Sequence, residues 1–359
     1  MNLLETDWRP VTAFLDSAVA GGAAPGAVLG VSVAGNRFLY ATGTLGQNEA
    51  ARPAPTTVYD LASLTKVVGL ATAVMLAVDD AKLDLDAPVQ RYVPTFVGEG
   101  KERVTIRMLL AHASGLPAWR PLYREVTTRS EAYALVDSTP LGTAPGSVTV
   151  YSDLGAILLT QVVETVYHER IDSLLERRVF QPLGLRSLQY LPPGSARDRI
   201  APTELDPRRG RILRGEVHDE NAALMDGVSG HAGLFGSADD VLTFAEWLLA
   251  QADHPSIPPT LPPSVIREFS RRQDLVPGSS RALGWDTPSP ESSAGIRLSS
   301  RSFGHTGFTG TSLWIDPDRQ LAIVLLSNRV NPTRENLRWT PVRARLADLV
   351  MTTLFEDAR

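Results

Sequence analysis

The chain contains 359 residues, of which 43% are hydrophobic and 21% charged, and its formal net charge is −5. This is the composition of a folded protein with a sizeable core, which excludes disordered, collagen-like and coiled-coil chains. The mild acidity argues against nucleic acid or an anionic membrane as a partner, and a chain without cysteine has no disulfide, thiolate nucleophile or cysteine-ligated metal.

The N-terminus shows no targeting signal. Its first ten residues, MNLLETDWRP, lack the basic start and the apolar run of a signal peptide. The longest nearly continuous apolar run, Val67–Val78, is shorter than a membrane-spanning helix requires. We therefore expect no membrane span and a cytoplasmic location, or a periplasmic or secreted one if a leader was removed before this numbering begins.

Strand patterns lie near both ends of the chain. Ala27–Val33 and Arg37–Thr42 flank a glycine–asparagine turn and predict a β-hairpin. Near the C-terminus, Thr311–Ile315 and Leu321–Ser327 flank an Asp-Pro-Asp turn and predict a second hairpin. A closing helix is predicted over Arg343–Phe355.

Helical patterns occupy the middle of the chain: Ser63–Asp79, Ile106–Ala111, Asp153–Val166, Ile171–Val179 and Ala238–Ala250. Pro255–Pro263 and Pro277–Gly295 are rich in proline and serine and predict loops. The pattern favours an α+β protein whose antiparallel sheet is built from both termini and flanked by helices. We expect one catalytic unit over 1–359, with an α/β part at about 1–70 and 230–359 and a largely helical inserted part at about 71–229.

The first chemical motif opens the helix predicted at Ser63. Ser63–Val78 is apolar almost all round, which predicts a buried central helix, and Ser63 and Lys66 share one face of it. A serine hydroxyl needs a base to become a nucleophile, and a lysine whose pKa is lowered by burial can be that base. The helix N-terminus would favour a developing oxyanion. Alone, this Ser-x-x-Lys is a weak signal, because an ordinary helix cap followed by a lysine gives the same pattern.

Two later motifs complete the pattern. Tyr151-Ser152-Asp153 opens an apolar helix, where a tyrosine hydroxyl can relay a proton and Asp153 can hydrogen-bond Lys66 or a substrate amide. The glycine-rich stretch His305-Thr306-Gly307 reads as an edge strand that substrate backbone can approach closely. Taken singly, the first is also the pattern of a capped helix with a packed tyrosine, and the second that of a turn entering a strand.

The order of the three motifs resembles the serine β-lactamase and penicillin-binding-protein superfamily. The likeness is to the branch that holds class C β-lactamases, family VIII carboxylesterases and D-alanyl-D-alanine carboxypeptidases. It extends from about residue 15 to the C-terminal helix. Five further blocks are similar to that branch: Tyr59–Lys66, Leu83–Val89, Thr105–Pro117, Phe180–Leu185 and Gly230–Phe235.

The resemblance implies a role for each motif residue. Ser63 would be the acylated nucleophile, Lys66 its partner in deprotonation and Tyr151 a second acid/base. The backbone N–H groups of Ser63 and Phe308 would form the oxyanion hole. The residues expected to bind substrate beside them are Asp153, His305, Thr306 and Gly307. The resemblance implies no metal and no organic cofactor.

Two positions depart from the β-lactamases of this branch. Asp153 stands where they usually have asparagine, and an ionised carboxylate accepts hydrogen bonds but donates none. His305 stands where they usually have lysine, and a neutral imidazole binds a substrate carboxylate less well than an ammonium does. Both changes weaken the case for an efficient β-lactamase and leave the acyl-transfer residues intact.

The sequence therefore predicts a serine hydrolase that cleaves a small ester or amide through an acyl-Ser63 intermediate, most like a carboxylesterase. Alternatives are a D-alanyl-D-alanine carboxypeptidase acting on an acyl-D-amino acid, a class C-like β-lactamase, or a non-catalytic penicillin-binding module. Neither the Gly-x-Ser-x-Gly elbow of α/β-hydrolases nor a Gly-x-Gly-x-x-Gly dinucleotide motif occurs in the chain. We expect His112 and His231 to order loops, and residues 218–221 to form a loop network near the cleft rather than a metal site.

Overall fold

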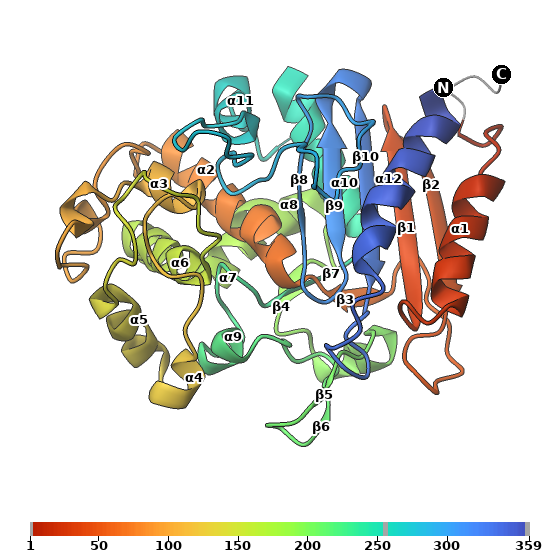
Figure 1. Cartoon of the computed structure of the whole chain (residues 1–359), viewed down its shortest axis with the longest axis horizontal. Helices are drawn as coiled ribbons and strands as arrows, with labels where there is room; N and C mark the ends of the chain where they lie inside the picture. Colours follow the sequence, from red (N-terminus) through yellow and green to blue (C-terminus); the bar gives the residue numbers. More distant parts are fainter. Residues whose placement is uncertain (1–2, 254–257, 356–359) are drawn as a thin grey trace.

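The computed structural model describes residues 3–253 and 258–355 and contains a five-stranded antiparallel sheet (Figure 1). The strand order is β2-β1-β10-β9-β8. The strands are β1 (Gly26–Val33), β2 (Asn36–Gly43), β8 (Phe303–Thr306), β9 (Ser312–Asp316) and β10 (Leu321–Ser327). Strand β1 pairs with β10, so the N-terminal and C-terminal hairpins join in one sheet. This confirms the α+β fold and the sheet expected from both chain ends.

Helices cover both faces of this sheet. Side chains along β1 alternate between the two faces, as the pleat requires. Leu29 and Val31 pack with α1 (Arg9–Ala20) and α12 (Thr340–Phe355), whereas Val28 packs into the core on the other face, where α10 (Ala238–Asp253) lies against β1 and β10. The sheet is therefore the middle layer of three at this end of the molecule (Figure 1).

The remaining helices form the other half of the molecule in Figure 1, apart from α8 and α11, which lie nearer the sheet. Their bounds are α2 (Thr72–Asp79), α3 (Ile106–Leu110), α4 (Leu122–Glu125), α5 (Arg129–Ser138), α6 (Asp153–Tyr167), α7 (Ile171–Leu175), α8 (Gln181–Leu183), α9 (Glu220–Leu224) and α11 (Pro263–Ser270). The predicted helices are present, but α1, α4, α5, α8, α9 and α11 were not predicted, and α9 begins within residues 218–221, which were expected to form a loop network. Of the loop predicted at Pro255–Pro263, residues 255–257 lie outside the described residues.

The helix predicted from Ser63 to Asp79 is built in three parts. A 3₁₀ turn (Ala62–Leu64) leads into a π-helical segment (Thr65–Ala71) and then into α2. Among the described residues, Ala62–Asp79 is the one helical stretch long and apolar enough to cross a membrane, and 83% of it is buried inside the protein. Such burial is typical of the core helix predicted from its all-round apolar pattern.

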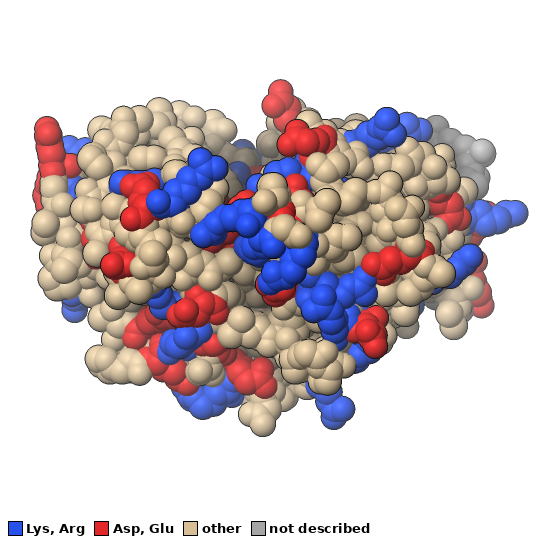
Figure 2. Space-filling model, turned by 90° about the horizontal axis from the view of Figure 1, so that it is seen from below, with Lys and Arg blue, Asp and Glu red and all other residues tan. Residues whose placement is uncertain are grey.

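Two small sheets, neither of them predicted, complete the fold. One has the strand order β3-β7-β4, and the other pairs β5 with β6. Their strands are β3 (Val58–Asp60), β4 (Gln189–Tyr190), β5 (Leu205–Asp206), β6 (Arg211–Ile212) and β7 (Leu234–Ser237). Strand β3 runs directly into the turn that carries Ser63, so this sheet fixes where the central helix begins. On the face shown in Figure 2, acidic and basic side chains are interspersed, with basic ones most concentrated near the middle.

Candidate active site

Ser63 is held by a constrained turn at the end of β3. The carboxylate of the buried Asp60 accepts hydrogen bonds from the backbone N–H groups of Ala62, at 2.8 Å, and His218, at 2.7 Å. Ala62 has a φ of +48°, in the left-handed region that alanine rarely adopts. Strained residues of this kind persist where the surroundings impose them, and they cluster at functional sites.

Lys66 lies within reach of Ser63 and is almost wholly buried. Its Nζ donates to Ser63 Oγ at 3.1 Å and to the carbonyl of His231 at 2.9 Å, and it forms an ion pair with Asp153 Oδ1 at 2.6 Å. Burial is the largest influence and lowers the pKa of Lys66, but attraction to Asp153 and Tyr151 outweighs it and raises the pKa above the ordinary 10.5. The condition for a lysine base, a pKa lowered by burial, is therefore not met, because Asp153 favours the ammonium form of Lys66; the part of Lys66 in deprotonating Ser63 stays a prediction.

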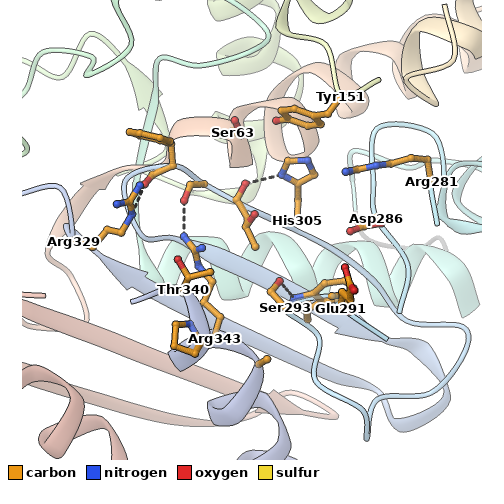
Figure 3. Close-up of a pocket in the computed structure, with 17 residues that line it drawn as sticks. Ser63, Tyr151, Arg281, Asp286, Glu291, Ser293, His305, Arg329, Thr340 and Arg343 are labelled. Carbon is orange, nitrogen blue, oxygen red and sulfur yellow. Dashed lines mark hydrogen bonds between the residues drawn. The ribbon is translucent and has the colours of Figure 1, made fainter. Parts of the chain in front are cut away.

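Tyr151 lies directly before Ser152, the N-cap residue of α6. Ser152 caps that helix by accepting the Gly155 N–H at 3.0 Å, which fixes the backbone directly after Tyr151. The Tyr151 ring centroid lies 5.0 Å from Lys66 Nζ and 5.2 Å from Arg281 Cζ. Its hydroxyl is buried and has no hydrogen-bond partner in the described chain, and in Figure 3 it points toward Ser63.

His305 sits at the end of edge strand β8, as predicted. Its ring centroid lies 5.7 Å from that of Tyr151, and its Nδ1 forms a hydrogen bond with the Thr306 carbonyl at 2.7 Å. Burial, followed by the positive charges of Arg281 and Lys66, holds the pKa of His305 well below 6.5. The imidazole is therefore neutral at neutral pH and supplies no charge to a substrate.

The loop after β8 is hydrogen-bonded to the turn before Ser63. Thr309 Oγ1 donates to the Asp60 carbonyl at 2.7 Å, and Thr311 Oγ1 donates to the Leu61 carbonyl at 2.9 Å. A Cβ atom on Gly307 would lie 2.5 Å from the Leu61 carbonyl oxygen, so only glycine allows this approach. Phe308, the residue expected to complete the oxyanion hole, follows at once.

Two cavities meet at Ser63, which lines both of them together with Tyr151 and Phe308. The larger, of about 660 Å³, is also lined by Arg281, His305, Thr306, Gly307 and Arg343. The smaller, of about 320 Å³, is also lined by Trp119, Asp153, His218, Asp219 and Glu220. The structure thus brings every site residue predicted from the sequence to one place, with space for a substrate on either side of the nucleophile.

The arginines of the larger cavity were missed by the sequence analysis. Arg281 lies in the loop predicted at Pro277–Gly295, where nothing local marks it. Backbone hydrogen bonds between Asp286 and Gly304, at 2.8 and 2.9 Å, hold this loop along β8. Within residues 3–253 and 258–355, Arg281 forms no ion pair with a carboxylate, and its guanidinium faces the cavity beside Ser63 (Figure 3).

The histidines predicted to order loops do so. His112 Nδ1 accepts the Ser152 N–H at 3.2 Å, beside Tyr151. His231 bonds Ser229 Oγ and Asp219 Oδ1, both at 2.8 Å, and its carbonyl holds Lys66. His218 bonds Glu204 at 2.9 Å. In the described part of the chain, no three His, Cys, Asp or Glu side chains are grouped to hold a metal ion.

A family model described as Beta-lactamase matches residues 11–348. The chain belongs to the β-lactamase family. A relative from Salmonella agona (strain SL483), provisionally named a D-alanyl-D-alanine carboxypeptidase, is 32% identical over 318 residues, covering 79% of this chain and 72% of the relative. The resemblance drawn from the motifs is confirmed, and the protein is a serine hydrolase of this superfamily.

Two solved structures show how widely this family's fold is shared. EstCE1, a hydrolase with promiscuous acyltransferase activity, superposes with a TM-score of 0.76 at 22% identity, over 96% of this chain and 98% of its own. A structure of SurE with D-Leu superposes with a TM-score of 0.71 at 25% identity, over 95% of this chain and 75% of its own. The β-lactamase fold of this chain therefore recurs in proteins with different names, and the substrate has to be argued from the site.

Proposed function

We propose that the protein hydrolyses the amide or ester bond between an acyl group and a D-amino acid whose carboxylate is free. The observation that carries this proposal is Arg281, a guanidinium without an acidic partner in the described residues, in the larger cavity beside Ser63. A free guanidinium at this position offers a carboxylate two parallel hydrogen bonds. We assign the larger cavity to the leaving group and the smaller one to the acyl group.

Arg281 removes the sequence-based objection to a carboxylate-bearing substrate. That objection rested on His305, which is indeed neutral, but the positive charge comes from the neighbouring loop instead. The Salmonella relative's name and the D-Leu in the SurE structure support a D-amino acid as the leaving group.

The charge state of Lys66 shapes the acylation step. An ammonium donates to Ser63 Oγ but cannot take its proton, so in our proposal the proton leaves toward Tyr151. As Ser63 Oγ adds to the acyl carbon, its proton passes to Tyr151 while the tyrosine's own proton passes to the nitrogen or oxygen of the leaving group, which gives a tetrahedral intermediate. Collapse of that intermediate then completes acylation. The bond from Ser63 Oγ to the acyl carbon forms, the bond to the leaving group breaks, and Tyr151 is neutral again.

Two features stabilise the tetrahedral intermediate in this proposal. The Lys66 ammonium, 3.1 Å from Ser63 Oγ, offsets negative charge that develops on that oxygen. The N–H groups of Ser63 and Phe308 hold the oxyanion. Water then repeats the sequence in reverse, with Tyr151 taking its proton as the ester to Ser63 is cleaved.

The carboxylesterase-like activity predicted from the sequence is the second candidate, because a neutral His305 suits an uncharged ester. The expected cytoplasmic location, which favoured an ester over cell-wall peptide, stays a prediction that cell fractionation tests. A non-catalytic penicillin-binding module would form a lasting adduct on Ser63 without turnover. One set of substrates distinguishes the D-amino acid hydrolase, the carboxylesterase and the non-catalytic module.

The test compares N-acetyl-D-alanyl-D-alanine, its C-terminal amide and p-nitrophenyl acetate on the parent protein and on Arg281→Gln. We expect the parent to prefer the free carboxylate and R281Q to lose about 10- to 100-fold in kcat/KM on that peptide alone, the effect of one charged contact of about 1.5–3 kcal/mol. The control is Arg272→Gln, whose guanidinium bonds Thr287 and Pro288 and does not line the cavity. Equal losses on all three substrates would overturn the carboxylate assignment, and turnover of the acetate alone would establish the esterase.

A further inference from the structure

Arg343 reaches from α12 to the loop that carries the proposed oxyanion-hole donor. Its Nη2 donates to the carbonyl oxygen of Gly307 at 2.6 Å. Within the described ranges Arg343 has no carboxylate partner, and its Nε is buried without a hydrogen-bond partner. A positive charge that no acid neutralises is therefore bonded to a single peptide group beside Ser63.

That peptide group is the one that bears the Phe308 N–H. The Gly307 carbonyl and the Phe308 N–H belong to the same peptide plane, which is trans, so they point in opposite directions. In the view of Figure 3 Arg343 and Ser63 lie apart, with the dashed bond from Arg343 to the Gly307 carbonyl between them. Phe308 lines both cavities together with Ser63, and no described residue accepts a hydrogen bond from its N–H.

We propose that Arg343 is a positioning residue for the oxyanion hole: its guanidinium fixes the 307–308 peptide plane and polarises it, which makes the Phe308 N–H a stronger donor. Hydrogen bonds in a chain strengthen one another, and a charged donor at the carbonyl end gives the strongest effect. The inference rests on the proposed function, because it concerns the same acyl transfer. It adds a residue that no sequence motif marks.

Other groups hold the same loop but leave this peptide alone. Arg329 Nε donates to the Phe308 carbonyl at 2.9 Å, and Trp339 Nε1 donates to the Gly310 carbonyl at 2.7 Å. Both bonds restrain the loop. Neither of these carbonyl groups belongs to the peptide group that contains the Phe308 N–H. Burial, with a smaller effect of Arg329, lowers the pKa of Arg343 to about 10, so the guanidinium stays charged at neutral pH.

The kinetic test uses Arg343→Met and Arg343→Lys, with Trp339→Phe as the matched loss of a loop hydrogen bond. We expect R343M to lower kcat by about 10- to 100-fold with little change in KM, below the roughly 10²–10³-fold cost of deleting an oxyanion donor outright. The loss should be the same on p-nitrophenyl acetate and on N-acetyl-D-alanyl-D-alanine, because both pass through the oxyanion. R343K should recover part of kcat, since an ammonium also donates to a carbonyl.

A spectroscopic test reads the oxyanion hole directly. Infrared difference spectra of a slowly hydrolysed acyl-Ser63 intermediate report how strongly the ester carbonyl is hydrogen-bonded. We expect its stretching band to move to higher frequency in R343M and to stay in place in W339F. The same measurement on R281Q separates the two proposals, because losing a leaving-group contact leaves this band unchanged.

Three outcomes would overturn the inference. A loss confined to the peptide with a free carboxylate would make Arg343 a substrate ligand. Matching losses of activity and stability in R343M and W339F, with an unmoved carbonyl band, would make it a purely structural residue. Failure of both substrates to acylate Ser63 in the parent protein would remove the proposed function and this inference together, whereas loss of the carboxylate preference alone would leave the inference intact.

Discussion

The ion pair between Lys66 and Asp153 joins a side chain that is 3% exposed to one that is 20% exposed. A buried ammonium is unstable unless a counter-charge lies close by. Because the pKa of Lys66 is raised, the stabilising contribution of the pair is fully present below pH 10.5 and is lost as the pH rises through that raised pKa. The charge of Lys66 thus depends mainly on the Asp153 carboxylate.

Replacing that carboxylate by an amide, in Asp153→Asn, should therefore lower the pKa of Lys66. We expect the free energy of unfolding at neutral pH to fall by about 3–5 kcal/mol, the cost of breaking a buried pair. The alkaline limb of the kcat/KM profile should move to lower pH, because the ammonium is lost sooner. Denaturant unfolding and pH–rate profiles measure both effects.

Asp86→Asn is the control for this prediction. Asp86 pairs with Arg107, but its side chain is 68% exposed, so its loss should cost about 0–1 kcal/mol. Its pH profile should match that of the parent. An unmoved alkaline limb in D153N would show that the Lys66 ammonium does not support the reaction.

Motif spacing was enough to predict Ser63, Lys66 and Tyr151 as neighbours, but not the charge of Lys66. That charge depends on the 2.6 Å separation from Asp153, and folding sets this distance between two motifs far apart in the chain. Arg281 and Arg343 were missed because lysine occurs only at three positions here and arginine is the ordinary basic residue. Only the structure shows which arginines have no carboxylate close by, and those are the ones that indicate a functional role.

At the scale of elements, the end of β8 packs against the turn that carries Ser63, and Gly307 leaves no room for a side chain at this contact. A methyl group there would lie 2.0 Å from Thr311 Oγ1 and 2.5 Å from the Leu61 carbonyl oxygen. Gly307→Ala should push the loop away from the turn and displace the Phe308 N–H. We expect the acylation rate to fall by about 10²–10³-fold, the cost of losing one oxyanion donor.

Burst kinetics with p-nitrophenyl acetate measure that acylation rate. Gly194→Ala is the control, because a Cβ at Gly194 would meet no atom within 4 Å and its backbone is not left-handed. G194A should acylate at the parent rate. An unchanged rate in G307A would mean that the Phe308 amide is not the donor.

Elements with strong local patterns were predicted, and those that depend on distant partners were not. The two hairpins combine alternating residues with turn signals, so their strands could be read locally. Strands β4, β5 and β6 have two residues each and exist only through their pairing. The loop at Pro277–Gly295 was predicted, but its place along β8 is set by the backbone hydrogen bonds between Asp286 and Gly304 and by Trp285, whose ring packs edge-on against Phe303 at 4.9 Å.

At the scale of the whole molecule, the sheet ties the two ends of the chain together while the central helix carries the nucleophile. We call the sheet and the central helix the frame of the molecule. It is supported by a core on each face of the sheet: one core packs against α1 and α12, and the other continues into the helical half. Helices α1, α5 and α11 were not predicted. Their apolar residues pack against distant segments in these cores, and that packing is not visible in the local sequence. Stability of the frame and activity of the site should therefore be separable by mutation.

Gly30 on β1 offers that separation, because it faces α10 and lines neither cavity at Ser63. A Cβ there would lie 2.7 Å from Leu242 Cδ1 and 3.3 Å from Leu39 Cδ2. Gly30→Val should lower the free energy of unfolding by about 1–3 kcal/mol through overpacking. Leu242→Ala alone should cost about 2–5 kcal/mol, through the cavity that it leaves.

The double variant decides whether this account of the frame is right. The valine fills space that the alanine vacates, so G30V/L242A should lose less stability than the two single changes added together. Denaturant unfolding measures the coupling, and kcat/KM measured well below the unfolding transition should equal that of the parent in all three proteins. Additive losses would place the strain of G30V somewhere other than Leu242, and a fall in kcat/KM would show that sheet–helix packing controls the geometry at Ser63.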